Sequence, residues 1–314
     1  MGLTLEELIK HSEIIINSRR IKDKIVILCE GEGGVWNLKG RPSPQSYGKM
    51  EQMPDANFYS RCVPKWWTQY RPQFFNCGDR KDVLDTYFKV LELHYEDSAK
   101  SYLNPKKLFA IVDLDLQVQK IDNYHFADTD EIFFNLYKES KVNKNNASQH
   151  RIWVTGLIHK EAYFLTPELQ SVFDNFPNHP YYQENILKLL DVYNDMVDAI
   201  CNDLDLQKHL QKSHARVSYC HGLDCTDVYK LCESWKAQFN YTQDEARKTQ
   251  LIIALLILKK AKFFWNQIKP SNDWTSSEQN FREQLSLAIG RFYSEYNCDD
   301  SHLPIFFKTL YKFI

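Results

Sequence analysis

The sequence lacks several features that would place it in a specialised class. Its longest uninterrupted apolar run, Leu251–Leu258, is far shorter than the roughly 20 residues that a membrane span needs. The first ten residues contain no apolar signal core, so we do not expect secretion. Lys and Arg number 39 and Asp and Glu 41, a net charge of −2 that excludes a protein coated in basic charge. The net charge does not exclude a local basic groove, because binding depends on where the charges lie.

Glycine is scarce, at 10 residues in 314, which favours helix. The eight cysteines are scattered and form no C-x-x-C pair, so we expect reduced thiols in the cytoplasm. A structural zinc site is a minor alternative; its candidate ligands would be His209, His214, Cys220 and Cys225.

The first part of the chain alternates between two kinds of hydrophobic pattern. Short continuous apolar runs, typical of buried strands, occur at 25–29, 74–77, 108–112 and 152–155. Between and before them, apolar residues recur at helical spacing at 4–17, 56–67, 79–95 and 132–137, and 160–165 also resembles a helix. Thr4 and Glu7 form a capping box for the first helix. This alternation predicts an α/β fold with a parallel sheet flanked by helices.

The pattern changes after Pro177. Long helix-like segments follow at 182–206, 225–239, 242–265 and 278–296, and we find no convincing strand among them. We therefore predict an α/β domain over 1–176 and an α-helical domain over 177–314. Within the latter, the stripe Leu251–Leu258 is interpreted as a buried helix, with a partner-binding helix as the alternative.

Acidic residues follow the predicted strands. Glu30 comes after the first, Asp113 and Asp115 after the third, and Glu161 shortly after the fourth. In parallel sheets, ligands bind beyond the carboxyl ends of the strands. In extended chain the two aspartates would point to one side, because side chains alternate with period two. Such carboxylates can hold Mg²⁺, and a further one can hold a second ion or act as a base, as phosphodiester cleavage requires.

Simpler interpretations exist for each of these residues. Asp113 and Asp115 could cap a turn after the strand, as Asp often does. Glu30 and Glu161 could be surface charges, and Asp55 could be only the N-cap of the helix at 56–67.

The order of these motifs resembles the Toprim domain of topoisomerases, bacterial primases, RNA-maturation nucleases and OLD nucleases. The likeness rests on Cys29-Glu30-Gly31, on Gly78 before a helix, on Asp113-x-Asp115 and on a later Glu161. That family usually has an aspartate a few residues after the glutamate–glycine pair. Here a fitting aspartate appears only at Asp55, which suggests an insertion at about 32–53.

Without that segment, the first half resembles a narrower group, the prokaryotic Toprim proteins found with ABC-type ATPases in phage defence. The segments 76–84 and 159–165 carry much of this likeness. The resemblance implies that Glu30 is a metal ligand or general base, that Asp113 and Asp115 are metal ligands, and that Asp55 and Glu161 are accessory acidic residues. Arg80 or Lys81 could contact phosphate, although no motif supports this.

Two functions compete at this point. The first is a Mg²⁺- or Mn²⁺-dependent endonuclease acting on DNA or RNA, probed by substituting Asp113. Its ATPase partner would be another chain, because no G-x-x-x-x-G-K-[ST] loop is present. The second is a catalytically inactive Toprim-fold protein with a binding or regulatory role. A primase or topoisomerase activity is less favoured, because no zinc ribbon or tyrosine-nucleophile domain accompanies the site.

An aromatic cluster offers a further candidate surface. We favour packing against the core, with stacking on nucleic-acid bases as the alternative. The cluster consists of Phe58, Tyr59, Trp66, Trp67, Tyr70, Phe74 and Phe75, flanked by Lys39, Arg41, Lys49, Arg61, Lys65 and Arg71.

Overall fold

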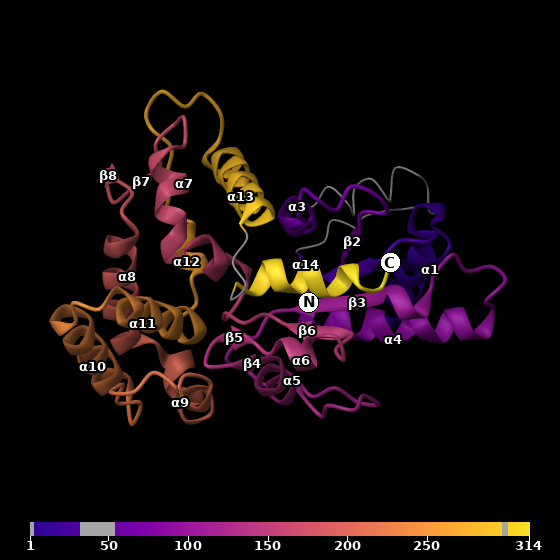
Figure 1. Ribbon diagram of the computed structural model, residues 1–314, viewed down its shortest axis with the longest axis horizontal. Helices are drawn as coiled ribbons and strands as arrows, with labels where there is room; N and C mark the ends of the chain where they lie inside the picture. The colour runs from indigo at the N-terminus through magenta and orange to yellow at the C-terminus, as the bar shows by residue number, and fades with distance from the viewer. Residues whose placement is uncertain (1–2, 32–53, 297–300) are drawn as a thin grey trace.

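The computed structural model describes residues 3–31, 54–296 and 301–314. At its centre lies a four-stranded, all-parallel sheet in the order β2-β1-β3-β6 (Figure 1). Its strands are β1 (Val26–Cys29), β2 (Gln73–Asn76), β3 (Leu108–Val112) and β6 (Ile152–Val154). All four predicted strands and their parallel arrangement are confirmed. The predicted insertion at 32–53, with Lys39, Arg41 and Lys49, lies outside the described residues.

The order of the strands creates a crevice at one place. From β1 the chain adds β2 on one side and then β3 on the other, so the direction of winding reverses between β1 and β3. Cys29 is level with Ile111 in this pair, so Glu30 and Asp113 both leave the sheet at its carboxyl edge. In open α/β sheets, the crevice at such a reversal is where ligands bind.

Helices pack against the sheet because its strands are buried and apolar. The helix α4 (Arg80–Glu96) contacts β1 and β3, and α1 (Leu5–Ile16) packs on α4. The predicted capping box of Thr4 and Glu7 is present. The next helix, α3 (Pro54–Cys62), begins before Asp55, so the prediction that Asp55 is the N-cap is wrong.

Several shorter elements connect these parts. The polar segment 138–149 contains most of a hairpin, whose turn residues Glu139 and Ser140 have φ of 50° and 60°. The predicted helix at 160–165 is a 3-10 turn. The connecting elements are η1 (Arg19–Ile21), η3 (Pro105–Lys107), α5 (Thr129–Leu136), β4 (Tyr137–Lys138), β5 (Lys141–Val142), α6 (Lys144–Ala147), η4 (Lys160–Phe164), η5 (Pro167–Leu169) and α7 (Gln170–Asp174).

The second half of the chain is mainly helical, as predicted. A small hairpin precedes the helices, however, so the prediction that no strand follows Pro177 is wrong. A single helix over 182–206 is also wrong, because the hairpin and η6 interrupt it. The elements are β7 (Tyr181–Tyr182), β8 (Asn185–Ile186), α8 (Leu189–Asp198), η6 (Ala199–Asn202), α9 (Leu204–Arg216), α10 (Val228–Tyr241), α11 (Glu245–Leu258), α12 (Lys262–Trp265), α13 (Glu278–Glu295) and α14 (His302–Tyr311).

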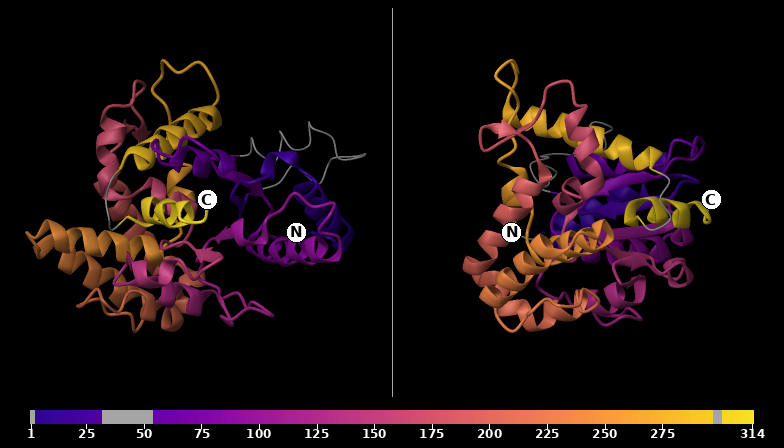
Figure 2. Two further views of the ribbon diagram at one scale, coloured as in Figure 1. Left: turned by 45° about the vertical axis from the view of Figure 1, so that its right-hand side comes forward. Right: turned by 60° about the vertical axis from the view of Figure 1, so that its left-hand side comes forward.

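The last two helices return to the α/β layer (Figures 1 and 2). Helix α13 packs along α3, and α14, which we did not predict, lies on the sheet face that carries Phe74, Phe109 and Trp153. The division at residue 177 stays a prediction, but the helical region does not end as a separate body. Within the described residues, no helix is long and apolar enough to span a membrane.

Candidate active site

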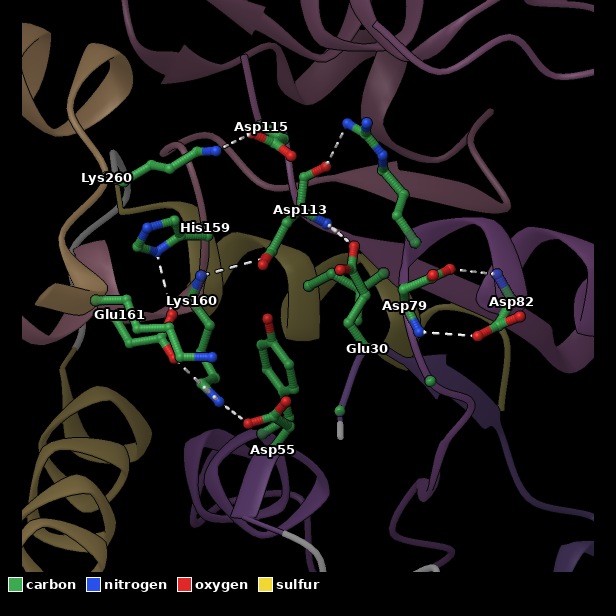
Figure 3. A pocket seen from close by; sticks show the side chains of 16 residues that line it. Glu30, Asp55, Asp79, Asp82, Asp113, Asp115, His159, Lys160, Glu161 and Lys260 are labelled. Atoms are coloured by element: carbon green, nitrogen blue, oxygen red, sulfur yellow. Dashed lines mark hydrogen bonds and ion pairs between the residues drawn. The ribbon is translucent and has the colours of Figure 1, made fainter. Parts of the chain in front are cut away.

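A pocket of about 670 Å³ opens at the carboxyl edge of the sheet, beside the crevice between β1 and β3 (Figure 3). We call it the acid pocket. Seven carboxylates and four cations line it together with His159 and Tyr59. The charged residues are Glu30, Asp55, Asp79, Asp82, Asp113, Asp115, Glu161, Arg80, Lys160, Lys260 and Lys262. All five acidic residues singled out from the sequence therefore reach one pocket.

Glu30 and Asp113 meet at the centre of this pocket. The backbone N–H of Asp113 donates to Oε1 of Glu30 at 2.6 Å, so β3 holds the glutamate that follows β1 (Figure 3). Burial raises the pKa of Glu30 to about 7, against the opposing effects of this hydrogen bond and of Arg80. Burial, together with the charges of Glu30 and Glu161, also raises the pKa of Asp113 well above its usual range. The two carboxylates thus share a buried position that disfavours their negative charge.

Asp115 departs from the predicted geometry. Its φ of 46° is left-handed rather than extended, so its carboxylate turns away from that of Asp113. Oδ1 accepts the N–H of Leu116 at 2.6 Å and lies 3.4 Å from Nζ of Lys260. Burial raises its pKa, but these two partners and Arg80 outweigh burial and lower it. The argument that both aspartates point to one side was therefore wrong.

Two arginines hold the backbone in this left-handed turn at Asp115. Arg216, on α9, donates from Nη1 to the carbonyl oxygen of Asp115 at 2.6 Å. Arg80, at the start of α4, donates from Nη1 to the carbonyl oxygen of Leu114 at 2.9 Å. Because both guanidiniums bind backbone oxygens here, the turn is fixed from two separate elements.

Asp55 and Glu161 gather around Lys160. The ammonium group of Lys160 pairs with Asp55 and lies 3.7 Å from Glu161, while its backbone N–H donates to Oδ1 of Asp113 at 3.2 Å. Burial lowers the pKa of Lys160. Asp55 reaches this position because the N–H of Ala56 donates to the buried amide oxygen of Asn76 at 3.1 Å, which holds the start of α3 against the end of β2.

His159 completes this side of the pocket. Its Nε2 accepts the N–H of Ala261 at 3.1 Å, so Nδ1 carries the proton of the neutral ring and faces Glu161 at 3.1 Å. Burial raises the pKa of Glu161, but His159 and Lys160 outweigh burial and lower it to about 2. Glu161 is therefore a permanently charged partner of His159 and Lys160.

Some pocket residues were not predicted from the sequence. His159 and Lys160 belong to the segment 159–165 that carries the Toprim resemblance, so this motif could have indicated them. Tyr59 and Lys260 gave no such signal. Of the two residues suggested for phosphate contact, Arg80 lines the pocket, whereas Lys81 is exposed and is not among the lining residues.

Comparison of the chain with protein-family models, curated proteins and solved structures found no match. The site must therefore be interpreted from its own chemistry.

The side chains that can act as metal ligands determine which cation the pocket can bind. Within the described ranges, no group of three or more His, Cys, Asp or Glu residues is arranged to hold a metal ion. The candidate metal ligands in the pocket are instead the two carboxylates of Glu30 and Asp113. Mg²⁺ is often held by one or two carboxylates, with waters and substrate phosphate oxygens as its other ligands. A buried pair of carboxylates whose charges repel one another fits such an ion, because the ion removes the repulsion.

Proposed function

We propose that this protein is a Mg²⁺-dependent nuclease of Toprim type. The observation that carries the proposal is the contact between Glu30 and Asp113 at the crevice between β1 and β3. Two half-buried carboxylates at this place are costly unless a cation compensates them. The order of the motifs on the strands supports the Toprim assignment, because each acidic residue follows the strand that the resemblance implies.

In this proposal, Glu30 and Asp113 hold the ion, Mg²⁺ or Mn²⁺. The bound ion would neutralise phosphate charge and activate water. Lys160 and Lys260 lie on the same side of the pair, beyond Asp113 (Figure 3), and would bind the non-bridging oxygens of a phosphodiester. Asp115 and Asp205 keep Lys260 in place, and Asp55 and Glu161 keep Lys160 in place. In this proposal Asp115, Asp55 and Glu161 therefore position cations rather than bind the metal.

The resemblance to the Toprim proteins also supports a proposal about the role of the protein in the cell. It supports a role in phage defence, in the cytoplasm, together with an ABC-type ATPase supplied by another chain. All seven cysteines among the described residues are free thiols, as a reducing compartment would require.

A second candidate is a catalytically inactive Toprim-fold protein. The observation that favours it is the pairing of Lys160 with Asp55 and of Lys260 with Asp115, which leaves fewer carboxylates for metal. Calorimetric titration with Mg²⁺ and Mn²⁺ separates the two candidates. Heat of binding that disappears in the Asp113→Asn variant supports the nuclease, and no heat with either ion supports the binding protein.

The direct test is cleavage of single- and double-stranded DNA and RNA with and without Mg²⁺. We expect Asp113→Asn and Glu30→Gln to lower the rate at least about 100-fold, because each removes one ligand of the ion, a loss of about 2.7 kcal/mol. Asp97→Asn, a half-buried aspartate at the C-cap of α4 that does not line the acid pocket, is the matched control and should cut at the rate of the unmodified protein. A fully active Asp113→Asn variant would rule the proposal out.

A further inference from the structure

A second hollow, of about 820 Å³, lies between α3 and α13. We call it the basic groove. Four cations line it, Arg61, Lys65, Arg71 and Arg291, and among the described residues that line it there is no carboxylate. The two helices lie side by side there (Figure 1), because Gly290 of α13 has no side chain where it meets α3. A Cβ on Gly290 would come within 2.8 Å of the Cβ of Arg61.

Helix α3 separates the basic groove from the acid pocket. Asp55 and Tyr59 line the acid pocket, whereas Asn57, Ser60 and Arg61 line the groove. At 3.6 residues per turn, these two sets fall on opposite sides of the helix. A helix with its side chains is about 10–12 Å across, so one bound strand of a few nucleotides can occupy both sites.

Positive charge is in excess in the groove. Lys65 and Arg291 share a single carboxylate, that of Glu295, at 2.5 Å and 3.1 Å. Burial and the nearby charge of Arg61 lower the pKa of Arg71.

Backbone oxygens hold Arg71 in this position. Its guanidinium donates to the carbonyl oxygens of Ser60, Val63 and Trp67 at 3.2 to 3.4 Å. Carbonyl groups fix the side chain without cancelling its charge. The guanidinium of Arg71 is therefore available to an anionic ligand in a fixed position, whereas Lys65 and Arg291 have largely exposed side chains.

Flat aromatic faces lie on the same loop as two of the groove cations. In this loop, between α3 and β2, Trp66 follows Lys65 and Tyr70 precedes Arg71. Trp66 is 49% exposed and Tyr70 is 54% exposed, whereas Trp67 between them is fully buried. The rings of Trp66 and Tyr311 pack edge to face, with centroids 4.8 Å apart. The predicted aromatic cluster thus divides: five members pack in the core as expected, and these two do not.

We propose that the basic groove, with Trp66 and Tyr70, binds single-stranded nucleic acid and leads it over α3 into the acid pocket. The groove cations contact the phosphate backbone and the two rings stack on bases, the combination that single-strand binding sites use. The inference rests on the proposed nuclease function and names its substrate class. A protein partner is the other class of ligand for this face, and the experiment below distinguishes the two.

The test is the fluorescence anisotropy of labelled oligothymidylate and oligouridylate with the full-length Asp113→Asn protein in EDTA, so that no strand is cut. We expect the Arg61→Ser/Arg291→Ser variant to bind about 10-fold more weakly and to reduce the slope of log affinity against log salt by about 1.4, which corresponds to two phosphates. Trp66→Ser should weaken binding about fivefold or more with the slope unchanged, because stacking is uncharged.

Two controls keep the result specific. Lys22→Ser/Lys106→Ser removes two exposed cations that precede β1 and β3, at the opposite edge of the sheet, and should leave affinity and slope unchanged. Arg61→Lys/Arg291→Lys keeps both charges and should keep the salt slope, which covers the case in which the serine variant does not fold.

Three outcomes would overturn the proposal. They are unchanged binding by the serine variant, duplex bound as tightly as single strand, and displacement by inorganic pyrophosphate as effective as by oligonucleotide at equal phosphate concentration. No binding of any oligonucleotide would assign the face to a protein partner. Because binding is measured without metal, it can persist when Mg²⁺-dependent cleavage is absent; that result rejects the nuclease and retains the binding site.

Discussion

At the scale of single residues, the acid pocket lowers the stability of the metal-free protein. Glu30 and Asp113 lie half-buried beside one another, and the loss of solvent raises the pKa of both. A carboxyl group whose pKa is raised in the folded state costs nothing below its unfolded pKa. The cost grows as the pH rises from the unfolded to the folded pKa and is complete above the folded pKa. The arrangement persists only because the surrounding strands hold it.

This cost gives a prediction for the metal-free protein. Glu30→Gln should raise the melting temperature at pH 8.5, with a gain on the order of 2–3 kcal/mol in unfolding free energy, because the amide keeps the acceptor oxygen without the charge. The gain should be smaller by roughly half at pH 5.5, because only part of the cost has developed one pH unit above the unfolded pKa of about 4.5. Calorimetric melting in EDTA at both pH values measures it. A Gln variant that is less stable at pH 8.5 contradicts this account.

At the scale of elements, Arg216 connects α9 to the turn after β3. Its side chain is fully buried, with Nη1 on the carbonyl oxygen of Asp115 and Nη2 at 2.7 Å from Asp130. The geometry of the acid pocket therefore depends on a helix about a hundred residues further along the chain. Neither the strand pattern nor the spacing of the aspartates contains this dependence.

Removing this connection should be costly. Arg216→Ala leaves Asp130 without its partner and frees the turn at Asp115, so we expect a loss of about 3–5 kcal/mol in unfolding free energy. Chemical denaturation measures this loss. Lys236→Ala, which breaks an exposed pair with Asp198, is the control and should cost less than about 1 kcal/mol. Equal losses in the two variants would show that Arg216 has no special role.

At the scale of the whole molecule, three buried histidines fix distant segments to one another. His302 of α14 accepts from the hydroxyl of Tyr163, whose oxygen takes the N–H of Gly156, and donates to the carbonyl oxygen of Ser140. Burial lowers the pKa of His302 to about 4, and it lowers the pKa of His11 and His150 to about 4 as well. All three rings are therefore neutral in the folded protein near neutral pH.

This burial predicts acid sensitivity. A histidine whose pKa is lowered by folding contributes no penalty above its unfolded value of about 6.5, and stability is lost as the pH falls from there towards 4. Each ring can contribute up to roughly 3 kcal/mol, because one pKa unit corresponds to 1.36 kcal/mol. Between pH 7 and pH 5 the three rings lower the melting temperature, against the opposite effect of Glu30 and Asp113, and His150→Gln, which can still donate to Asn135, should reduce this loss. The exposed His179→Gln is the control, and a parallel slope for His150→Gln would contradict the assignment.

The sequence by itself determined the parallel sheet and the two strand ends, those of β1 and β3, after which Glu30 and Asp113 follow. Uninterrupted apolar runs can be buried on both faces only in a parallel sheet covered by helices, so local pattern is enough. The tertiary structure alone decided the direction of Asp115, the cations beside Asp55 and Glu161, and the return of α13 and α14. These depend on contacts between residues far apart in the chain, such as Arg216 with Asp115 and Lys160 with Asp55, which hydrophobic periodicity does not encode.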